Sequence, residues 1–242
     1  MTGKLILCGT PIGNLEDASP RLARVLGEAD AIACEDTRRT KKLLSHFGVT
    51  AKRLLVYNDR NERRQAPRLV ELIAKGRAVA LVSDAGMPGL SDPGYHLVRA
   101  CIEKSVPIEG VPGPSAVLTA LALSGFSGSR FVFEGFLPRR KAERQRRVAE
   151  LSEEERTTIL FESPARLRDT LIALAAVAPD REAVIARELT KLHEEVIRGT
   201  VAELAESLAD DTVRGEIVLV LHGAAASRAE VSAELLARRA RD

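Results

Sequence analysis

The chain has 242 residues, of which 45% are hydrophobic, and a formal net charge of +2, so it can bury the core of one large domain or two smaller ones. Its start, MTGKLILCGT, lacks a secretory signal, and the longest mainly apolar run, residues 116–123, is too short to cross a bilayer, which predicts a cytoplasmic protein without a membrane partner. Cys8, Cys34 and Cys101 are widely spaced in apolar segments, which favours buried thiols over disulfides, and we expect no metal.

In the first half of the chain, short apolar runs alternate with helical patterns. The runs that predict strands are residues 4–9, 31–35, 53–57, 78–83 and 107–111. Between them, residues 19–28 and 62–75 carry apolar side chains at helical spacing, and Ser19 and Pro20 form a typical helix start. This βα alternation predicts a mainly parallel sheet covered by helices.

The second half continues the α/β pattern. Strands are predicted at residues 131–136, 157–163, 182–187, 194–199 and 215–223, with a helix at residues 165–177. The close spacing of the last strands indicates some antiparallel pairing. The PGPSA segment at residues 112–116 marks a boundary, so we divide the chain into domains 1–113 and 114–242. The second domain ends in a charged helix or fraying tail at residues 228–242.

Three Gly/Pro-rich loops follow strands of the first half: GTPIGN (residues 9–14), SDAGMPGLSDPG (83–94) and VPGPSA (111–116). Such loops commonly supply only turns, but three of them beyond the carboxyl ends of strands indicate a ligand pocket. The dinucleotide fingerprint and the P-loop motif are both missing, which argues against a nucleotide site of the usual kind. Backbone amides and carbonyls, with Asp84 and Asp92 at the edge, suit S-adenosylmethionine, whose sulfonium prefers oxygen atoms to cations.

These loops, together with AIACEDTRRTKKLLSHFG (residues 31–48), ARELTKLHEEVIRGT (186–200) and RGEIVLV (214–220), resemble the tetrapyrrole methylase superfamily. The EDTR and RELTKLHEE motifs are most similar to its bacterial branch of 16S rRNA cytidine 2′-O-methyltransferases. The resemblance implies two α/β domains with S-adenosylmethionine in the cleft between them, and a homodimer. The implied partner is 16S rRNA, free or in the assembled 30S subunit, methylated on a cytidine ribose.

The same resemblance implies which residues contact the methyl donor. They are Thr10, Pro11, Gly13 and Asn14 in the first loop, Asp84, Ala85, Gly86, Met87 and Pro88 in the second, and Ser115 and Ala116 in the third. Two positions depart from the family pattern. Met87 replaces a threonine, so backbone contacts alone are expected there. Residues 57–62 (YNDRNE) are less rich in histidine than the usual YHEHNE, which weakens a histidine base in that loop.

Methyl transfer to a ribose 2′-oxygen needs in-line alignment and removal of the hydroxyl proton. The candidate side chains in the charged segment 187–195 are Glu188, Lys191, His193 and Glu194. They offer bases and a cation that could hold the developing alkoxide, although charge runs are also typical of solvated loops. Glu35 and Asp36 compete for the role of base, and a helix-capping role for Asp36 is an equal alternative.

Basic residues cluster in PRRKAERQRR (residues 138–147) and around residues 38–42. The RNA contacts that we predict are Arg38, Arg39, Arg139, Arg140, Lys141 and Arg144. Contacts of this kind to phosphates give affinity without sequence specificity, and a merely solvated helix face is the alternative. Aromatic residues make up only 3% of the chain, which argues against a base-stacking platform.

Two other functions stay open at this point. One is a small-molecule methylase that acts on a corrin-type tetrapyrrole, whose anionic groups could also use basic residues. The other is a non-catalytic RNA-binding assembly factor that keeps the fold without turnover.

Overall fold

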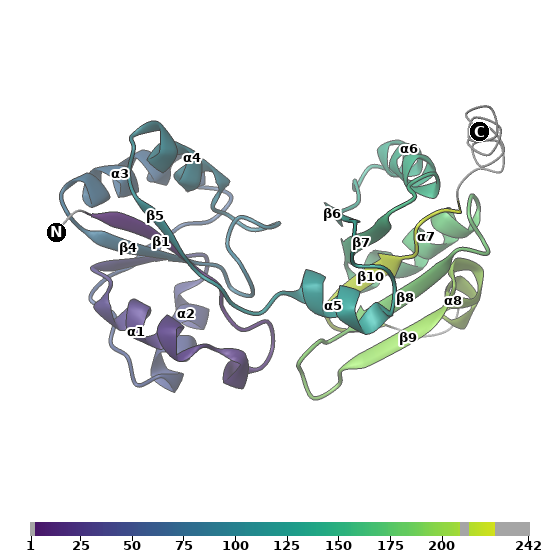
Figure 1. Ribbon diagram of the computed structural model, residues 1–242, viewed down its shortest axis with the longest axis horizontal. Coiled ribbons are helices and arrows are strands. Elements are labelled where there is room, and N and C mark those ends of the chain that lie inside the picture. Colours follow the sequence, from purple (N-terminus) through teal and green to yellow (C-terminus); the bar gives the residue numbers. More distant parts are fainter. Residues whose placement is uncertain (1–2, 209–212, 226–242) are drawn as a thin grey trace, which may run out of the picture. The chain divides into compact units, whose positions relative to one another are not determined.

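A computed structural model describes residues 3–208 and 213–225 (Figure 1). The chain divides into two compact units, Met1–Ala116 and Val117–Asp242, so the division lies after Ala116 where the sequence suggested Gly113. Each unit contains its own sheet with its own helices, and the expected α/β class is confirmed. The charged segment predicted at residues 228–242 lies outside the described residues.

The sheet of the first unit has five parallel strands in the order β3-β2-β4-β1-β5. They are β1 (Lys4–Cys8), β2 (Ala31–Cys34), β3 (Leu54–Val56), β4 (Ala78–Val82) and β5 (Ile108–Val111), which confirms the five predicted strands. The inner strands β2 and β4 are almost entirely buried apolar runs because helices cover both faces of the sheet. β3 and β5 form its two edges, and their residues are more exposed.

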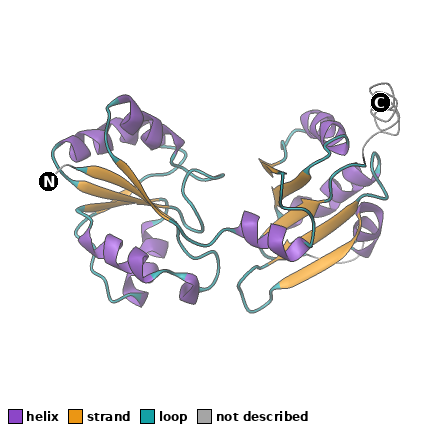
Figure 2. Ribbon diagram, in the orientation of Figure 1, coloured by secondary structure: helices purple, strands orange, loops and turns teal. Residues whose placement is uncertain are grey.

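Two helices cover each face of this sheet, as Figure 2 shows. α1 (Pro20–Glu28) and α2 (Thr37–His46) bury apolar side chains against one face, and α3 (Glu62–Ala74) and α4 (Tyr95–Glu103) against the other. A short 3-10 helix, η1 (Leu15–Asp17), precedes α1. Helix α1 begins as predicted, because the Ser19 hydroxyl accepts a hydrogen bond from the Leu22 amide at 3.1 Å and Pro20 occupies the first turn.

The sheet of the second unit is mixed, with the strand order β6-β7-β10-β8-β9. Its strands are β6 (Phe131–Phe136), β7 (Thr157–Glu162), β8 (Glu182–Arg187), β9 (Glu195–Thr200) and β10 (Ile217–Leu221). β6 and β7 are parallel, whereas β10 pairs antiparallel with β7 and with β8, and β8 pairs antiparallel with β9. The predicted antiparallel pairing late in the chain is thereby confirmed.

The described helices of this unit are α5 (Ala116–Ser124), α6 (Lys141–Ser152), α7 (Pro164–Ala175) and α8 (Val201–Ser207). Leucine and valine side chains of α6, α7 and α8 form one core with the sheet strands. Helix α7 corresponds to the helix predicted at residues 165–177. Helix α8 starts at a capping box, in which the Thr200 hydroxyl accepts from the Glu203 amide at 3.2 Å and the Glu203 carboxylate accepts from the Thr200 amide at 2.7 Å.

Cys8, Cys34 and Cys101 are free and buried, as predicted. None of the helices within residues 3–208 and 213–225 has the length and apolar character needed to cross a membrane. In the same ranges, no three His, Cys, Asp or Glu side chains are grouped so that they could hold a metal ion.

Candidate functional site

The three Gly/Pro-rich loops leave neighbouring strands of the first unit. They follow β4, β1 and β5, which are adjacent in that order in the sheet. Because all strands of this sheet are parallel, their carboxyl ends meet at one edge, which is where open α/β sheets bind ligands. The structure therefore brings the three predicted donor loops together at this edge.

Backbone hydrogen bonds tie the first loop to the second. The Thr10 amide donates to the Gly86 carbonyl at 2.9 Å, and the Gly86 amide donates to the Thr10 carbonyl at 3.1 Å. The Thr10 hydroxyl is buried and donates to the Ser83 carbonyl at 3.3 Å. Gly86 has a φ of +81°, a conformation that favours glycine. Thr10 thus fixes the relative position of the two loops.

The third loop packs directly on the first through two glycines. A Cβ atom on Gly113 would lie 2.6 Å from the carbonyl oxygen of Gly9, and one on Gly9 would lie 2.7 Å from the amide nitrogen of Gly113. Both contacts are to backbone, so only glycine fits at either position. A Cβ on Gly86 would lie 3.5 Å from Ile12 and 3.9 Å from the carbonyl oxygen of Pro114, so all three loops meet around Gly86.

The predicted donor residues differ in exposure. Thr10, Pro11, Gly86 and Pro88 are buried, Gly13 is exposed, and Asn14, Asp84, Ala85, Met87, Ser115 and Ala116 are half-buried. The Asn14 side chain caps η1 by accepting a hydrogen bond from the Glu16 amide at 3.1 Å. The half-buried residues leave part of their surface open to a ligand, whereas the buried ones shape the loops.

Carboxylates give this edge of the sheet a negative field. Burial, followed by the charge of Glu35, raises the pKa of Asp92 to about 6. Burial, followed by the charge of Asp84, raises the pKa of Glu35. Asp84 accepts a hydrogen bond from the Asp36 amide at 3.1 Å, and its other carboxylate oxygen lies 3.5 Å from Nε of Arg39. Such a field suits a ligand that carries an ammonium or sulfonium group.

Asp36 caps helix α2, which is the alternative role that the sequence indicated. Its carboxylate accepts hydrogen bonds from the Arg38 amide at 2.8 Å and from the Arg38 guanidinium at 2.7 Å. The side-chain hydrogen bonds from Arg38 lower the pKa of Asp36 to about 2. A carboxylate held in its ionised form in this way is a weak base, so the geometry argues for the capping role.

A second cluster lies in the other unit, where Glu188 and Lys191 of the turn between β8 and β9 form one ionic network with Glu216, the residue before β10. Lys191 Nζ lies 2.7 Å from a carboxylate oxygen of Glu188 and 3.2 Å from one of Glu216, and the Glu216 amide donates to Glu188 at 2.8 Å. The hydrogen bond from Lys191 lowers the pKa of Glu188. Burial opposes the charge on Lys191, but the hydrogen bond to Glu188 and the charge of Glu216 raise its pKa overall. The network therefore holds a fixed ammonium beside an ionised carboxylate.

The backbone of this turn is unusual. Glu188 and Thr190 have φ angles of +51° and +65°, although neither is glycine. The Glu194 carboxylate accepts a hydrogen bond from the Thr190 amide, so it stabilises the turn. Strained backbone of this kind is retained where surrounding contacts fix it, and it is common at functional sites. His193 is exposed, as is Glu194.

The predicted RNA contacts differ in their availability. Arg139 and Lys141 are exposed, and among the described residues neither has an ion pair within 4.0 Å. Arg140 pairs with Glu143 at 3.3 Å, whereas the Arg144 side chain is only 13% exposed and lies 3.8 Å from Asp169.

In the first unit the two predicted arginines are both paired. Arg38 lies 2.7 Å from Asp36, and Arg39 lies 3.5 Å from Asp84. Arg139 and Lys141 are therefore the freest of the predicted cations.

Sequence reasoning missed two groups that the structure places at these clusters. Glu216 joins the network of Glu188 and Lys191, but it belongs to a later part of the chain and no local pattern connects it to them. The Ser83 hydroxyl donates to the carbonyls of Ala85 and Gly86 and folds the second loop back on itself. Its position at the end of the strand predicted at residues 78–83, where the Gly/Pro-rich loop begins, was the available signal.

Comparison with known proteins gives a consistent result. A sequence model of the Tetrapyrrole (Corrin/Porphyrin) Methylases matches residues 4–205. The "Ribosomal RNA small subunit methyltransferase I" of Thermotoga maritima is 49% identical over 91% of this chain and 99% of its own length. The protein of the same name from Mycobacterium bovis is also 49% identical, over 93% of this chain and 79% of its own length.

A solved structure agrees with the fold. The uroporphyrin-III C-methyltransferase of Thermus thermophilus, complexed with S-adenyl homocysteine, aligns with a TM-score of 0.64 at 18% identity. The alignment covers 91% of this chain and 97% of that chain.

Proposed function

Because the chain belongs to the tetrapyrrole methylase family, and is a methyltransferase by its relatives, we propose that it transfers a methyl group from S-adenosylmethionine to the ribose 2′-oxygen of a cytidine in 16S rRNA. The observation that carries this proposal is the 49% identity to a curated small-subunit rRNA methyltransferase over 91% of the chain. The tetrapyrrole methyltransferases among the similar structures share the fold at much lower identity, which makes a corrin-type substrate the weaker alternative.

The loops at the carboxyl edge of the first sheet fit S-adenosylmethionine. Gly9 and Gly113 pack backbone on backbone, which holds these two loops side by side, so their amides and carbonyls can be offered together to a ligand. The nearby carboxylates, Asp84, Asp92 and Glu35, suit the two positive groups of the donor. Bound there, S-adenosylmethionine would supply an activated methyl group.

The residues of the β8–β9 turn are suited to the acceptor oxygen. Lys191 keeps its proton because two carboxylates surround it, so it can donate a hydrogen bond to an oxygen that develops negative charge. Glu188 is already committed to Lys191 and to the Glu216 amide, and we assign it the task of positioning Lys191. Glu194 holds the turn through Thr190 and, being exposed, remains the candidate base of this segment.

The substrate proposal extends to the partners of the protein. Arg139, Arg140 and Lys141, at the start of α6, would contact RNA phosphates together with Arg38 and Arg39, and Arg144 would support that surface from its partly buried position. We further propose a homodimer that acts in the cytoplasm on 16S rRNA or on the 30S subunit.

The test is methyl incorporation from labelled S-adenosylmethionine into three acceptors: 30S subunits that lack the modification, deproteinised 16S rRNA, and a tetrapyrrole precursor. We expect label in one or both ribosomal acceptors and none in the tetrapyrrole. Label in the tetrapyrrole alone would overturn the proposed substrate. Donor binding in calorimetry without transfer to any acceptor would favour a non-catalytic RNA-binding factor.

A further inference from the structure

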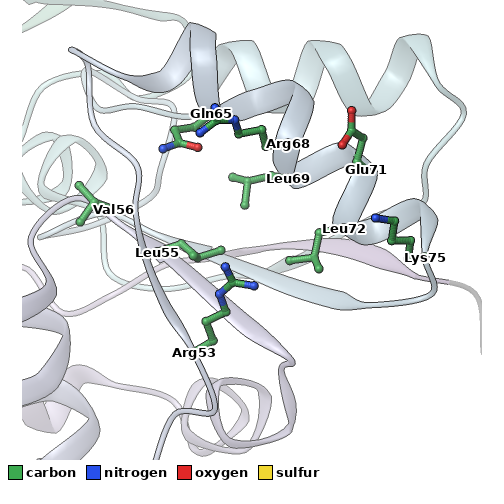
Figure 3. A pocket seen from close by; sticks show the side chains of 9 residues that line it. All are labelled: Arg53, Leu55, Val56, Gln65, Arg68, Leu69, Glu71, Leu72 and Lys75. Carbon is green, nitrogen blue, oxygen red and sulfur yellow. The ribbon is translucent and has the colours of Figure 1, made fainter.

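The first unit contains a groove beside its edge strand β3. It is a cavity of about 360 Å³ between the edge strand β3 and helix α3 (Figure 3). Its lining residues are Arg53, Leu55, Val56, Gln65, Arg68, Leu69, Glu71, Leu72 and Lys75. None of them belongs to the predicted donor, catalytic or RNA-binding sets.

The groove combines an apolar floor with a cationic rim. Leu55 of β3 faces Leu69 and Leu72 of α3, and the side chains of Arg53 and Arg68 lie around them (Figure 3). The α3 residues reach the groove together because helix positions three and four apart share one face. A volume of this size lies within the range of about 300–1,000 Å³ that is usual for small-ligand sites.

The cations of the groove are not neutralised. Its lining contains three positive side chains, Arg53, Arg68 and Lys75, and one carboxylate, Glu71. Within residues 3–208 and 213–225, ion pairs within 4.0 Å involve other residues, so the side chains of these three cations are free to bind an anion.

That freedom sets the groove apart from the basic cluster around Arg38. There, Arg38 lies 2.7 Å from Asp36, and Arg39 lies 3.5 Å from Asp84. An anionic partner at the groove would therefore displace no internal ion pair.

The chemistry of the groove selects between two anionic partners. An acidic peptide that added a strand to β3 would need free backbone groups at this edge, but β3 has only three residues and the Val56 carbonyl already accepts a hydrogen bond from the Asn61 side chain at 3.1 Å. Guanidinium groups, in contrast, match the oxygens of a phosphate with paired hydrogen bonds. The apolar floor suits the face of a ribose or base.

We propose that the β3–α3 groove binds a phosphodiester segment of the RNA substrate, as an RNA contact separate from the donor loops and from α6. The inference rests on the proposed function, because the RNA is the substrate proposed above. Arg53 and Arg68 bind the phosphate, Lys75 adds charge, and Leu55, Leu69 and Leu72 contact the nucleoside. The groove anchors RNA and takes no part in the chemistry.

The test compares two double variants of the full chain in binding to 30S subunits and to deproteinised 16S rRNA over a series of salt concentrations. Arg53→Gln with Arg68→Gln removes two charges from the groove. The matched control, Arg24→Gln with Arg99→Gln, removes two charges from helices α1 and α4. Among the described residues, each of these arginines pairs only with a glutamate of its own helix. Calorimetry with S-adenosylmethionine reports whether each variant keeps a folded first unit.

We expect the groove variant to bind both RNA acceptors about tenfold more weakly near physiological salt, and its slope of log affinity against log salt to fall by about 1 to 2, because each lost phosphate contact contributes roughly 0.7–0.9. The control should stay within about twofold of the wild type, and donor binding should be unchanged in both variants.

Equal binding by the groove variant and the control would overturn the proposal. A loss on 30S subunits without a loss on free 16S rRNA would assign the groove to a ribosomal protein and would also overturn it. Methyl transfer by the wild type is measured in parallel. If the wild type methylates RNA and the groove variant binds RNA as tightly as the control, only the proposal for the groove is refuted. If the wild type neither binds nor methylates either acceptor, the proposed function is refuted and the proposal for the groove with it.

Discussion

Replacing Gly113 with alanine should separate the donor loops without touching any charged group. The new Cβ would lie 2.6 Å from the carbonyl oxygen, 2.7 Å from the carbonyl carbon and 2.9 Å from the Cα of Gly9. All three contacts are to backbone, so no side chain can rotate away to make room. The loops after β1 and β5 must move apart instead.

The size of the effect follows from that overlap. Carbon contacts are most favourable at about 3.5–4.0 Å, so the loops must separate by about 1 Å. Forcing extra atoms into a packed site typically costs about 1–3 kcal/mol. If half of that cost, about 0.5–1.5 kcal/mol, falls on the loop geometry that a donor needs, the dissociation constant should rise by about 2- to 12-fold, since 1.4 kcal/mol corresponds to a factor of ten.

Gly110→Ala is the matched control. Gly110 lies on β5, close in sequence to Gly113, but a Cβ there would meet nothing within 4 Å, and its φ does not lie in the range that disfavours L-residues. The stability of the Gly110→Ala variant should equal that of the wild type or rise slightly, because alanine restricts the conformations of the unfolded chain. Urea unfolding midpoints and calorimetry with S-adenosylmethionine measure both quantities. The reasoning is refuted if Gly113→Ala and Gly110→Ala unfold at the same midpoint and bind the donor equally.

Three further outcomes are expected. The raised pKa of Asp92 means that the folded state binds the proton of this carboxyl more tightly than the unfolded state, so the unfavourable contribution of Asp92 to stability should disappear as the pH falls from about 7 towards 4. Asp92→Asn should therefore be more stable than the wild type at pH 8 by roughly 1–2 kcal/mol, allowing for partial screening by solvent, and equally stable near pH 4. A difference in unfolding free energy that stayed constant between these pH values would contradict this prediction. Lys191→Met should lower kcat by about 100-fold or more with donor affinity unchanged, and Lys191→Arg should recover part of the lost activity. Single-turnover rates measure this effect, and a wild-type rate in the methionine variant would show that Lys191 has no role in the reaction. Thr200→Ala should lose about 1 kcal/mol of stability because it removes the capping box of α8, whereas Thr200→Ser should stay close to the wild type. Equal urea midpoints for the alanine and serine variants would show that the cap contributes nothing.

The sequence predicted the elements better than their arrangement. Each strand of the first unit is an apolar run with turn residues after it, and the Ser19–Pro20 start of α1 is a local signal, so neighbouring residues were enough. The strand order β3-β2-β4-β1-β5 depends on how strands far apart in sequence pair, and no local pattern contains it. The adjacency of the three donor loops therefore needed the structure.

In the candidate site too, local features were predictable from the sequence and contacts between distant segments were not. The loop glycines could be found from composition, but the contact of Gly9 with Gly113 and the bridge of Thr10 with Gly86 join separate strands. The segment of residues 187–195 was recognised as charged, yet the sequence could not show that Glu216 would complete the surroundings of Lys191.

The β3–α3 groove was missed for a related reason. Arg53 and Arg68 come from different elements and form no run in the sequence, so their convergence on one groove depends on the packing of α3 beside β3.

The most direct test of the proposed activity is nucleoside analysis of 16S rRNA after reaction with methyl-labelled S-adenosylmethionine. The rRNA would be taken from 30S subunits that lack the modification, digested completely, and separated by mass spectrometry. We predict label in 2′-O-methylcytidine and in no other nucleoside, and loss of that label in Lys191→Met. Label on a base, or no label in the RNA while the donor binds, would contradict the assignment of this chain as a ribose methyltransferase.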